Sequence, residues 1–275
     1  MESLFCCPIC GEGLRREPGR YACPGGHSFD LAREGYVNLL PANRQHSKEP
    51  GDDREMAAAR SRFLEGGWYA PLREALCALV EKYAPEEPAL LDAGCGEGWY
   101  TAALGETVLA RGGRIAGVDL SKPGVKRAAR RQSRGEFGVA SVYHLPLGDG
   151  RVDILVDCFS PLAAKEFYRV LKPGGIFLYV VPGPRHLWEL KSVLYDSPYE
   201  NQDRREEYAG FRYLDVVPVE YAFTLTGAQA IGDLFRMTPY FWKTPREGAE
   251  RLGELEELTT TAQFRIHVME AKKEG

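Results

Sequence analysis

The sequence predicts an α/β protein, with an open, mostly parallel sheet, an antiparallel last strand and a small N-terminal metal-binding module. From residue 89 onward, apolar runs of strand length alternate with helical patterns, which is typical of an α/β sheet. A glycine-rich turn, residues 94–98, follows the first of these strands. Potential metal ligands gather within the first 27 residues. A chain of 275 residues is long enough for one large domain and one small module.

The composition is ordinary for a globular protein, with 44% hydrophobic and 27% charged residues. No apolar stretch approaches the roughly 18 residues that a membrane span needs, and the amino terminus lacks the pattern of a secretory signal. We therefore expect a cytoplasmic protein without a membrane partner, whose seven cysteines stay reduced. With a net charge of −4, the chain would need local basic patches to attract nucleic acid.

Residues 1–32 carry a C-x2-C-x12-C-x3-H pattern formed by Cys7, Cys10, Cys23 and His27. Four such ligands suit tetrahedral Zn²⁺ in a closed structural site, and a closed site leaves no position for catalysis. Cys6 is an alternative ligand to Cys7. We prefer Cys7, because Cys7-Pro8 and Cys23-Pro24 then begin the two ligand pairs in the same way. The other interpretation is scattered cysteines and a surface histidine. Because the segment has little core of its own, metal binding should supply most of its folding energy.

The remaining chain divides into a linker with a helix, residues 33–66, and a main domain, residues 67–275. Helix formers predict helices at 55–64 and 68–83. We expect parallel strands at 89–93, 113–119, 137–141, 152–158 and 175–181. The connecting helices are expected at 98–110, 122–133, 161–171 and 185–195. Two final strands are expected at 216–225 and 263–269, with helices at 227–237 and 246–258 between them.

The glycine-rich turn follows an acid, so that Asp92, Gly94, Gly96 and Gly98 form a D-x-G-x-G-x-G pattern. Glycine lets backbone N–H groups approach a ligand closely, and the spacing differs from the phosphate-binding G-x-G-x-x-G. The pattern resembles motif I of class I S-adenosylmethionine-dependent methyltransferases; the alternative is an ordinary α/β turn. Asp119 ends the next strand, where open α/β sheets bind ribose hydroxyls. Together these features predict a nucleoside-containing cofactor.

Two further turns resemble those of class I methyltransferases, Leu145-Pro146 after the third strand and residues 171–175 before the fifth. Ser141 lies where the adenine ring is expected. Many class I enzymes carry Asp at this position, so backbone groups would here bind the adenine amino group.

Residues 111–134 are strongly basic, with eight cations against one acid. The cations are Arg111, Arg114, Lys122, Lys126, Arg127, Arg130, Arg131 and Arg134. They form either an RNA-contacting surface or a solvated helix face. The cluster Tyr240, Phe241 and Trp242 leaves a similar choice between stacking on nucleobases and packing in the core.

Along almost its whole length the chain resembles the bacterial large-subunit (23S) ribosomal RNA guanine-N1 methyltransferases. The zinc pattern, motif I and four further segments carry this resemblance: residues 34–41, Pro50-Gly51-Asp52, residues 182–187 and residues 237–239. The family implies a Rossmann-like class I methyltransferase sheet behind a zinc-ribbon module that helps to recognise RNA. It also implies S-adenosyl-L-methionine and one structural Zn²⁺ as cofactors, and a homodimer with an RNA cleft.

The resemblance further implies a reaction and additional cofactor contacts. The substrate would be an unpaired guanine in a hairpin loop of large-subunit rRNA, methylated at N1. Tyr69, Glu97, Gly98 and His186 would also contact the cofactor. Tyr69 either closes over the methionine end of the cofactor or packs on the sheet, and both interpretations remain open.

The acceptor slot of this fold follows the fourth strand, here residues 157–161. Guanine N1 lies on the Watson–Crick edge, so the base must be splayed out, and Phe159 is a candidate to stack on it. Asp157 is the acid of the slot and a candidate general base. The alternatives are that Asp157 supports a neighbouring group, or that no base acts beyond solvent. Cys158 is expected to be a small buried residue, and the slot lacks the Asn/Asp-Pro-Pro-Tyr sequence associated with exocyclic amines.

Two rival functions remain from other classes. One is a small-molecule methyltransferase that carries a zinc ribbon, and methylation of an isolated RNA hairpin would distinguish it. The other is a non-catalytic RNA-binding protein, which the intact motif I and Asp119 argue against.

Overall fold

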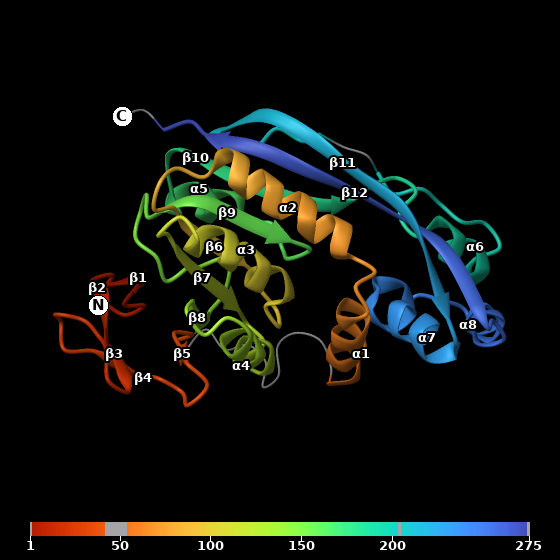
Figure 1. Cartoon of the computed structure of the whole chain (residues 1–275), viewed down its shortest axis with the longest axis horizontal. Helices are drawn as coiled ribbons and strands as arrows, with labels where there is room; N and C mark the ends of the chain where they lie inside the picture. Colours follow the sequence, from red (N-terminus) through yellow and green to blue (C-terminus); the bar gives the residue numbers. More distant parts are fainter. Residues whose placement is uncertain (1, 42–53, 203–204, 274–275) are drawn as a thin grey trace.

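The computed structural model describes residues 2–41, 54–202 and 205–273 and contains two sheets. Figure 1 shows the small sheet at one end of the molecule, the large sheet in the middle and a helical cluster at the opposite end. Pro50-Gly51-Asp52, and the rest of the expected linker from 42 to 53, lie outside the described residues. None of the described helices has the length and apolar composition needed to cross a membrane.

The small sheet is antiparallel and follows the chain order. Its strands are β1 (Glu2–Cys6), β2 (Gly13–Glu17), β3 (Arg20–Ala22) and β4 (Ser28–Asp30). The two turns that carry the metal-ligand pairs lie outside these strands, where the chain reverses direction. The architecture is the zinc-ribbon module expected from the ligand spacing.

The large sheet has the order β11-β12-β10-β9-β6-β7-β8-β5. Its strands are β5 (Tyr36–Asn38), β6 (Ala89–Ala93), β7 (Arg114–Asp119), β8 (Glu136–Val139), β9 (Val152–Cys158), β10 (Leu171–Pro182), β11 (Phe211–Thr226) and β12 (Glu257–Ala271). All neighbouring pairs are parallel except those made by β12, which runs antiparallel to β10 and β11. The predicted class I methyltransferase fold, with its antiparallel last strand, is confirmed.

Helices connect and cover these strands. They are α1 (Arg54–Glu65), α2 (Ala70–Tyr83), α3 (Trp99–Leu109), α4 (Lys122–Arg131), α5 (Ala164–Val170), α6 (Trp188–Leu194), α7 (Ala228–Met237) and α8 (Arg246–Gly253). Alternate residues of β6 point to opposite faces, so Leu90 belongs to the apolar cluster of α2 and α3, whereas Leu91 belongs to the cluster that includes Phe167 of α5. The sheet therefore separates two hydrophobic cores.

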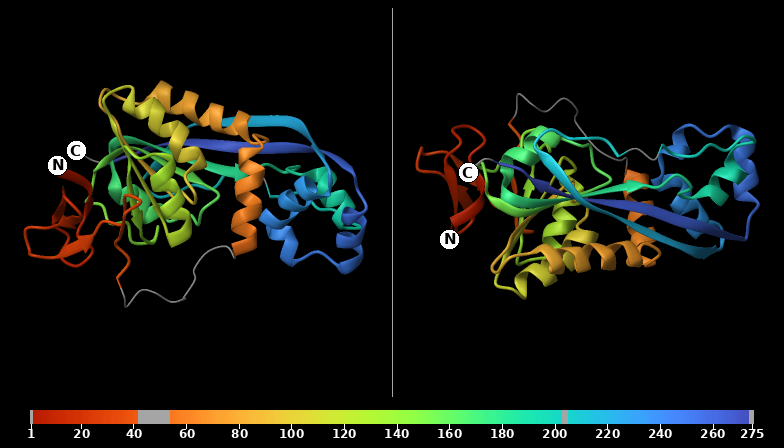
Figure 2. Two further views of the ribbon diagram at one scale, coloured as in Figure 1. Left: turned by 60° about the horizontal axis from the view of Figure 1, so that its bottom comes forward. Right: turned by 90° about the horizontal axis from the view of Figure 1, so that it is seen from above.

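Several elements differ from the sequence expectation. The expected linker contains β5, which pairs in parallel with β8 at the edge of the large sheet. A three-residue strand is too short to give a periodic signal. β11 and β12 are longer than expected, with 16 and 15 residues, because they continue to pair with each other beyond β10 (Figures 1 and 2). Helices α7 and α8 connect them at that end. Helices α5, α6 and α8 are shorter than expected at one or both ends.

The N-terminal module shares its core with the large sheet rather than having one alone. Phe5 of β1 is buried in the same cluster as Leu91 and Ala116, and it bridges to Leu147. Glu136 of β8 accepts hydrogen bonds from the Ser3 hydroxyl and, at 3.1 Å, from the Leu4 N–H. Strand β1 is therefore docked by apolar and polar contacts that do not involve the metal ligands.

Candidate cofactor, metal and acceptor sites

The predicted zinc ligands converge on one point. One ligand atom from each of Cys7, Cys10, Cys23 and His27 lies within 4.8 Å of the other three. Cys10 Sγ is 3.6 Å from Cys23 Sγ, which is 3.5 Å from His27 Nδ1. Tetrahedral Zn²⁺ requires separations of about 3.8 Å for two sulfur ligands and about 3.6 Å for sulfur and nitrogen, given its usual bond lengths. The donor set therefore fits structural zinc, and Cys7 rather than Cys6 belongs to the cluster.

The three glycines of motif I face different surroundings. A Cβ atom on Gly98 would lie 2.7 Å from the Ala128 Cβ of α4, and one on Gly94 would lie 2.2 Å from the Ser160 Cβ after β9. Both glycines also have positive φ, 76° and 87°. A Cβ on Gly96 would meet no described atom within 4 Å. Two glycines thus allow the turn to pack against protein, while the space beside Gly96 can admit the cofactor.

The two motif acids have different roles in the structure. Asp92 is only 2% exposed and accepts a hydrogen bond from Thr101 Oγ1 at 2.5 Å. Burial, together with the nearby Asp119 charge, raises the pKa of Asp92 to about 7. Asp119 ends β7, and its two oxygens accept the N–H groups of Gly96 (3.0 Å) and Ser121 (2.7 Å). Asp119 thus lies at the carboxyl edge of the sheet, the edge at which open α/β sheets bind ligands, whereas Asp92 is buried beside the turn and hydrogen-bonded to α3.

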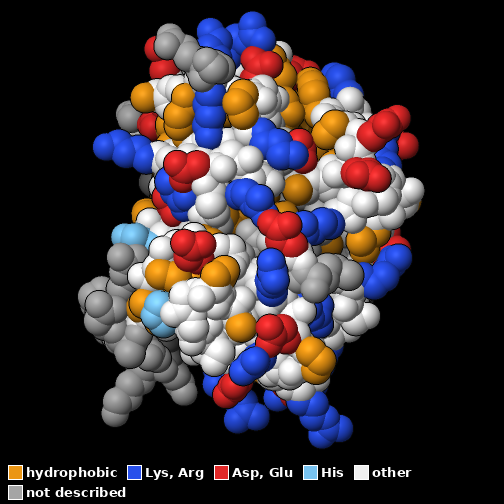
Figure 3. Space-filling model, turned by 90° about the vertical axis from the view of Figure 1, so that its left-hand side faces the viewer, with side chains coloured by type: hydrophobic (Ala, Val, Ile, Leu, Met, Phe, Trp, Pro, Cys, Tyr) orange, Lys and Arg blue, Asp and Glu red, His pale blue; other side chains and the backbone are white. Residues whose placement is uncertain are grey.

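Glu97 links the glycine turn to the basic helix. It is buried, and its two oxygens lie 3.2 Å from Arg131 and 3.5 Å from Arg127. Lys126 and Arg130 both pair with Glu34 at 3.0 Å. The basic face of α4 is therefore matched by acids of the same chain. Lys and Arg side chains are likewise interleaved with Asp and Glu on the end of the molecule that carries the small sheet (Figure 3).

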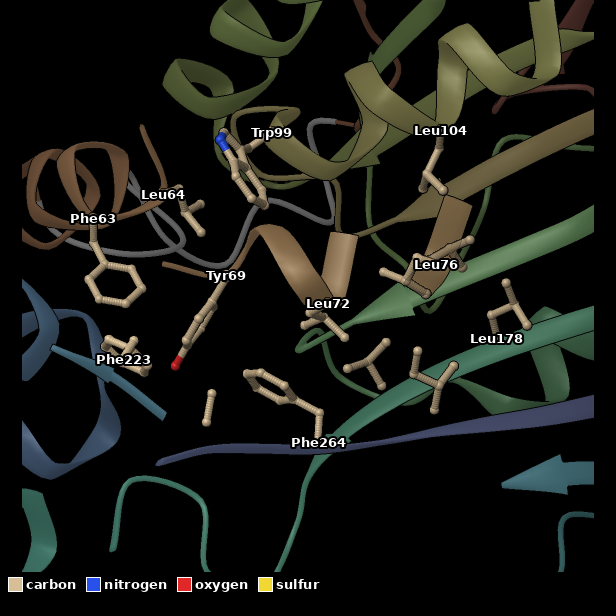
Figure 4. Packing of buried hydrophobic residues seen from close by; sticks show 14 of the residues in the cluster. Phe63, Leu64, Tyr69, Leu72, Leu76, Trp99, Leu104, Leu178, Phe223 and Phe264 are labelled. Carbon is tan, nitrogen blue, oxygen red and sulfur yellow. The ribbon is translucent and has the colours of Figure 1, made fainter. Parts of the chain in front are cut away.

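Tyr69 and His186 meet in the core beside the cofactor edge. The Tyr69 hydroxyl lies 3.3 Å from His186 Nε2, and the Gln263 N–H donates to His186 Nδ1 at 3.2 Å. Burial lowers the pKa of His186 to about 3, so the ring is neutral, and because Nδ1 accepts, Nε2 carries the proton. The Tyr69 ring is buried between Phe63 and Phe264 (Figure 4). Tyr69 therefore packs on the sheet, as one of the two interpretations expected, and its hydroxyl also contacts His186, the histidine expected at the cofactor.

The acceptor slot is a tight turn after β9. Asp157 is fully buried, and its Oδ1 accepts the Ser160 N–H at 3.0 Å. Burial, partly offset by the Ser160 hydrogen bonds, raises the pKa of Asp157 to about 7. Phe159 has a φ of 65° and is 48% exposed, an unusual combination for a large apolar residue. Strained backbone and exposed aromatic surface of this kind are typical of functional sites.

Ser141 and the aromatic cluster occupy more peripheral positions. Ser141 follows β8, and its hydroxyl accepts the Tyr143 N–H at 3.3 Å. It lines a cavity of about 570 Å³ between the Cys7 turn and residues 144–149. In the 3-10 helix Pro239–Trp242, Tyr240 packs against the main core, whereas Trp242 is 67% exposed. The core interpretation therefore holds for Tyr240, and Trp242 offers an open ring.

Three functional features were not expected from the sequence. Thr101 holds Asp92, Gln263 orients His186, and Ser160 packs against Gly94. Each contact joins residues that lie 9 to 77 positions apart, so no local pattern signals it. The left-handed Leu187, beside His186, has no local signal either.

Comparison with known proteins agrees with this geometry. A family model described as the N-terminal part of RlmA matches residues 5–48, and a model described as a methyltransferase domain matches residues 91–179. The 23S rRNA (guanine(748)-N(1))-methyltransferase of Streptomyces fradiae is 35% identical over 94% of this chain and 95% of its own. YxjB of Bacillus subtilis, provisionally named a 23S rRNA (guanine-N(1)-)-methyltransferase, is 34% identical over 96% of both chains. A protein of Micromonospora griseorubida with the same provisional description is 40% identical over 67% of each chain.

Proposed function

Because this chain belongs to the 23S rRNA (guanine-N1)-methyltransferase family, we propose that it methylates N1 of an unpaired guanine in a hairpin loop of large-subunit rRNA. The methyl donor of this family's methyltransferase domain is S-adenosyl-L-methionine. The contact between Gly94 and Ser160 carries the proposal, because it joins the cofactor turn to the acceptor slot. A bound sulfonium and an inserted base would then lie next to each other.

The chemistry explains why positioning is the main task of the protein. The bound cofactor supplies an electrophilic methyl group, so the enzyme has to hold N1 in line with it and allow the N1 proton to leave. N1 lies on the Watson–Crick edge, which makes a looped-out base the accessible substrate. The exposed ring of Phe159 offers the surface on which such a base can stack.

The cofactor contacts are proposed residue by residue. Asp119 would bind the ribose hydroxyls, and the backbone beside Gly96 would approach the cofactor. Glu97 Oε2 is buried and forms an ion pair with Arg127 at 3.5 Å, but it accepts no hydrogen bond among the described residues, which suits a donor on the ligand. Tyr69 and His186 would border the methionine end, and Ser141 the adenine end.

The proposal also covers the N-terminal zinc module, the cellular compartment and the oligomeric state. One structural Zn²⁺ would fold the ligand turns, which would help to recognise the hairpin. The thiolate ligands Cys7, Cys10 and Cys23 suit the cytoplasm, where thiols stay reduced. A homodimer, implied by the family resemblance, would give the RNA a cleft shared by two copies.

The direct test is to incubate the zinc-loaded protein with labelled cofactor and a transcript of the large-subunit hairpin. We expect N1-methylguanosine after digestion, and a reverse-transcriptase stop one nucleotide before the modified base, because N1 methylation blocks pairing with cytosine. A matched hairpin, in which the target guanine is paired within the stem, should receive no label.

The outcomes separate the rival functions. Label found only as N7-, N2- or ribose-methylated nucleoside would contradict the proposed position. Transfer to small molecules but not to any RNA would favour a small-molecule methyltransferase. Tight RNA binding without cofactor binding would favour a non-catalytic RNA-binding protein.

A further inference from the structure

The acceptor slot is held by a hydrogen-bonded network centred on Ser160. The Ser160 N–H donates to Asp157 Oδ1 at 3.0 Å, and the Ser160 Oγ lies 2.8 Å from the same oxygen. The Oγ also lies 2.8 Å from the carbonyl oxygen of Ala93, the last residue of β6. These contacts close the turn over residues 157–160 and tie it to the neighbouring strand.

The same serine touches the cofactor turn. Because a Cβ on Gly94 would come within 2.2 Å of the Ser160 Cβ, the Ser160 side chain lies as close to the Gly94 backbone as a glycine allows. A movement of Ser160 would therefore displace either the acceptor slot or the start of motif I. Asp157 fixes the position of Ser160 in this contact through its hydrogen-bonded oxygen, Oδ1.

Phe159 lies at the top of the turn and is supported from behind. Its ring centre is 5.6 Å from that of Phe264, which is fully buried in β12. Phe264 in turn contacts His186, with ring centres 4.6 Å apart. The half-exposed face of Phe159 is thus backed by a fixed aromatic layer that includes the predicted cofactor neighbour.

We propose that Asp157 is a positioning residue that acts through Ser160 to fix the Phe159 ring and the cofactor turn relative to each other. Asp157 does not take the guanine N1 proton. This inference rests on the proposed function, because it assigns a role within that reaction.

The burial of Asp157 is the reason for this choice. A general base has to come within hydrogen-bond reach of the proton that it accepts, yet Asp157 is 0% exposed. Its Oδ1 is already occupied by Ser160, and its Oδ2 is buried with no hydrogen-bond partner in the described part of the chain. A carboxyl group enclosed in this way supports a turn, and the N1 proton leaves to solvent at the open face of Phe159.

The test compares Asp157→Asn with Asp157→Ala in the full-length, zinc-loaded protein, using the hairpin transcript as substrate. Asparagine keeps an oxygen that can accept from Ser160, whereas alanine removes it. We expect Asp157→Ala to lower kcat/KM for the hairpin by about 10- to 100-fold, and Asp157→Asn to recover most of this loss with an unshifted pH–rate profile. Ser160→Ala should resemble Asp157→Ala, because it removes the hydroxyl in the middle of the network.

Three outcomes would overturn the inference. If asparagine is as damaging as alanine, with a loss of about 100-fold or more and a vanished pH limb, Asp157 is a general base. If neither variant affects kcat/KM, the network has no functional role. If Ser160→Ala is fully active, Asp157 does not act through Ser160. Thermal melting and S-adenosylhomocysteine calorimetry check that each variant is folded. Failure of the wild-type protein to make N1-methylguanine would instead refute the proposed function.

Discussion

The N-terminal ligand turns and the large sheet are stabilised in opposite ways. The turns around Cys10 and His27 have little apolar contact, and Ile9 beside them is 63% exposed. The large sheet has apolar clusters on both faces, and even its acid Asp92 is buried. The metal therefore has to stabilise the turns, whereas apolar burial stabilises the sheet. Strand β1 belongs to the sheet in this respect, because Phe5 shares the sheet's core.

The largest difference between the two regions is expected when one metal ligand is removed. Cys23→Ser should release zinc and loosen residues 7–30, while β1 stays docked through Phe5 and Glu136. We expect activity on the hairpin to fall by about 100-fold or more, because the turns fold only with metal, and cofactor affinity to survive. Hydrogen exchange, metal analysis and calorimetry measure the three effects.

Cys6→Ser is the matched control, because Cys6 is adjacent to a ligand but outside the cluster. It should keep full zinc content. A wild-type protein that carries no zinc when purified without chelators would contradict the assignment.

The second experiment perturbs the sheet and leaves the turns intact. Asp119→Ala removes the carboxylate that the Gly96 and Ser121 N–H groups hold at the end of β7. We expect a loss of about 2 kcal/mol in cofactor binding, roughly 30-fold, with unchanged zinc content. Calorimetry with S-adenosylmethionine measures it, and the exposed Asp215 replaced by Ala serves as control. Unaltered affinity in Asp119→Ala would mean that the ribose binds elsewhere.

The third experiment measures how the buried carboxyl group of Asp92 changes the free energy of unfolding with pH. The pKa of Asp92 is about 7 in the folded chain and near 3.8 when unfolded, so between these pH values the folded chain holds the extra proton. Wild-type stability from this group should therefore fall as pH rises from about 4 to about 7, by at most about 1.4 kcal/mol per pH unit, and then level off.

Asp92→Asn removes this pH dependence, so its free energy of unfolding relative to wild type should rise between pH 5 and pH 7 and stay constant above. Urea denaturation at several pH values, with zinc present, measures the difference. His186 contributes with the opposite sign, since its folded pKa is lowered to about 3, but it is present in both proteins and cancels. A difference that does not vary with pH would show that Asp92 ionises normally.

The smallest effect is expected on α4, which packs on β7 and β8 of the large sheet. Lys126 and Arg130 share the single carboxylate of Glu34, so their charge is partly offset within the chain. The double variant Lys126→Gln, Arg130→Gln should change the slope of log affinity for RNA against log salt by less than about one unit. Filter binding at several salt concentrations measures it. A decrease near two units would assign both cations to phosphate contacts and revive the RNA-surface interpretation of this helix.

Much of the site followed from local sequence patterns, because its parts are short and chemically distinctive. The zinc spacing places each pair of ligands on one short turn, motif I gathers its glycines on another, and Asp119 directly ends a strand. The order of apolar runs then predicted the parallel sheet, and the resemblance to class I methyltransferases predicted the antiparallel last strand. Element ends were less predictable, as in β5 and the long β11–β12 hairpin, because pairing with distant strands decides them.

The amino-acid sequence by itself thus determined the metal ligand set, the cofactor turn and the family. Only the tertiary structure decided which motif I glycine has open space beside it, that the basic helix is paired with acids, and that Asp157 is buried and hydrogen-bonded to Ser160. The physical reason is one of range. Ligand spacing and backbone freedom are properties of neighbouring residues, whereas burial and charge pairing depend on residues that meet only when the chain has folded.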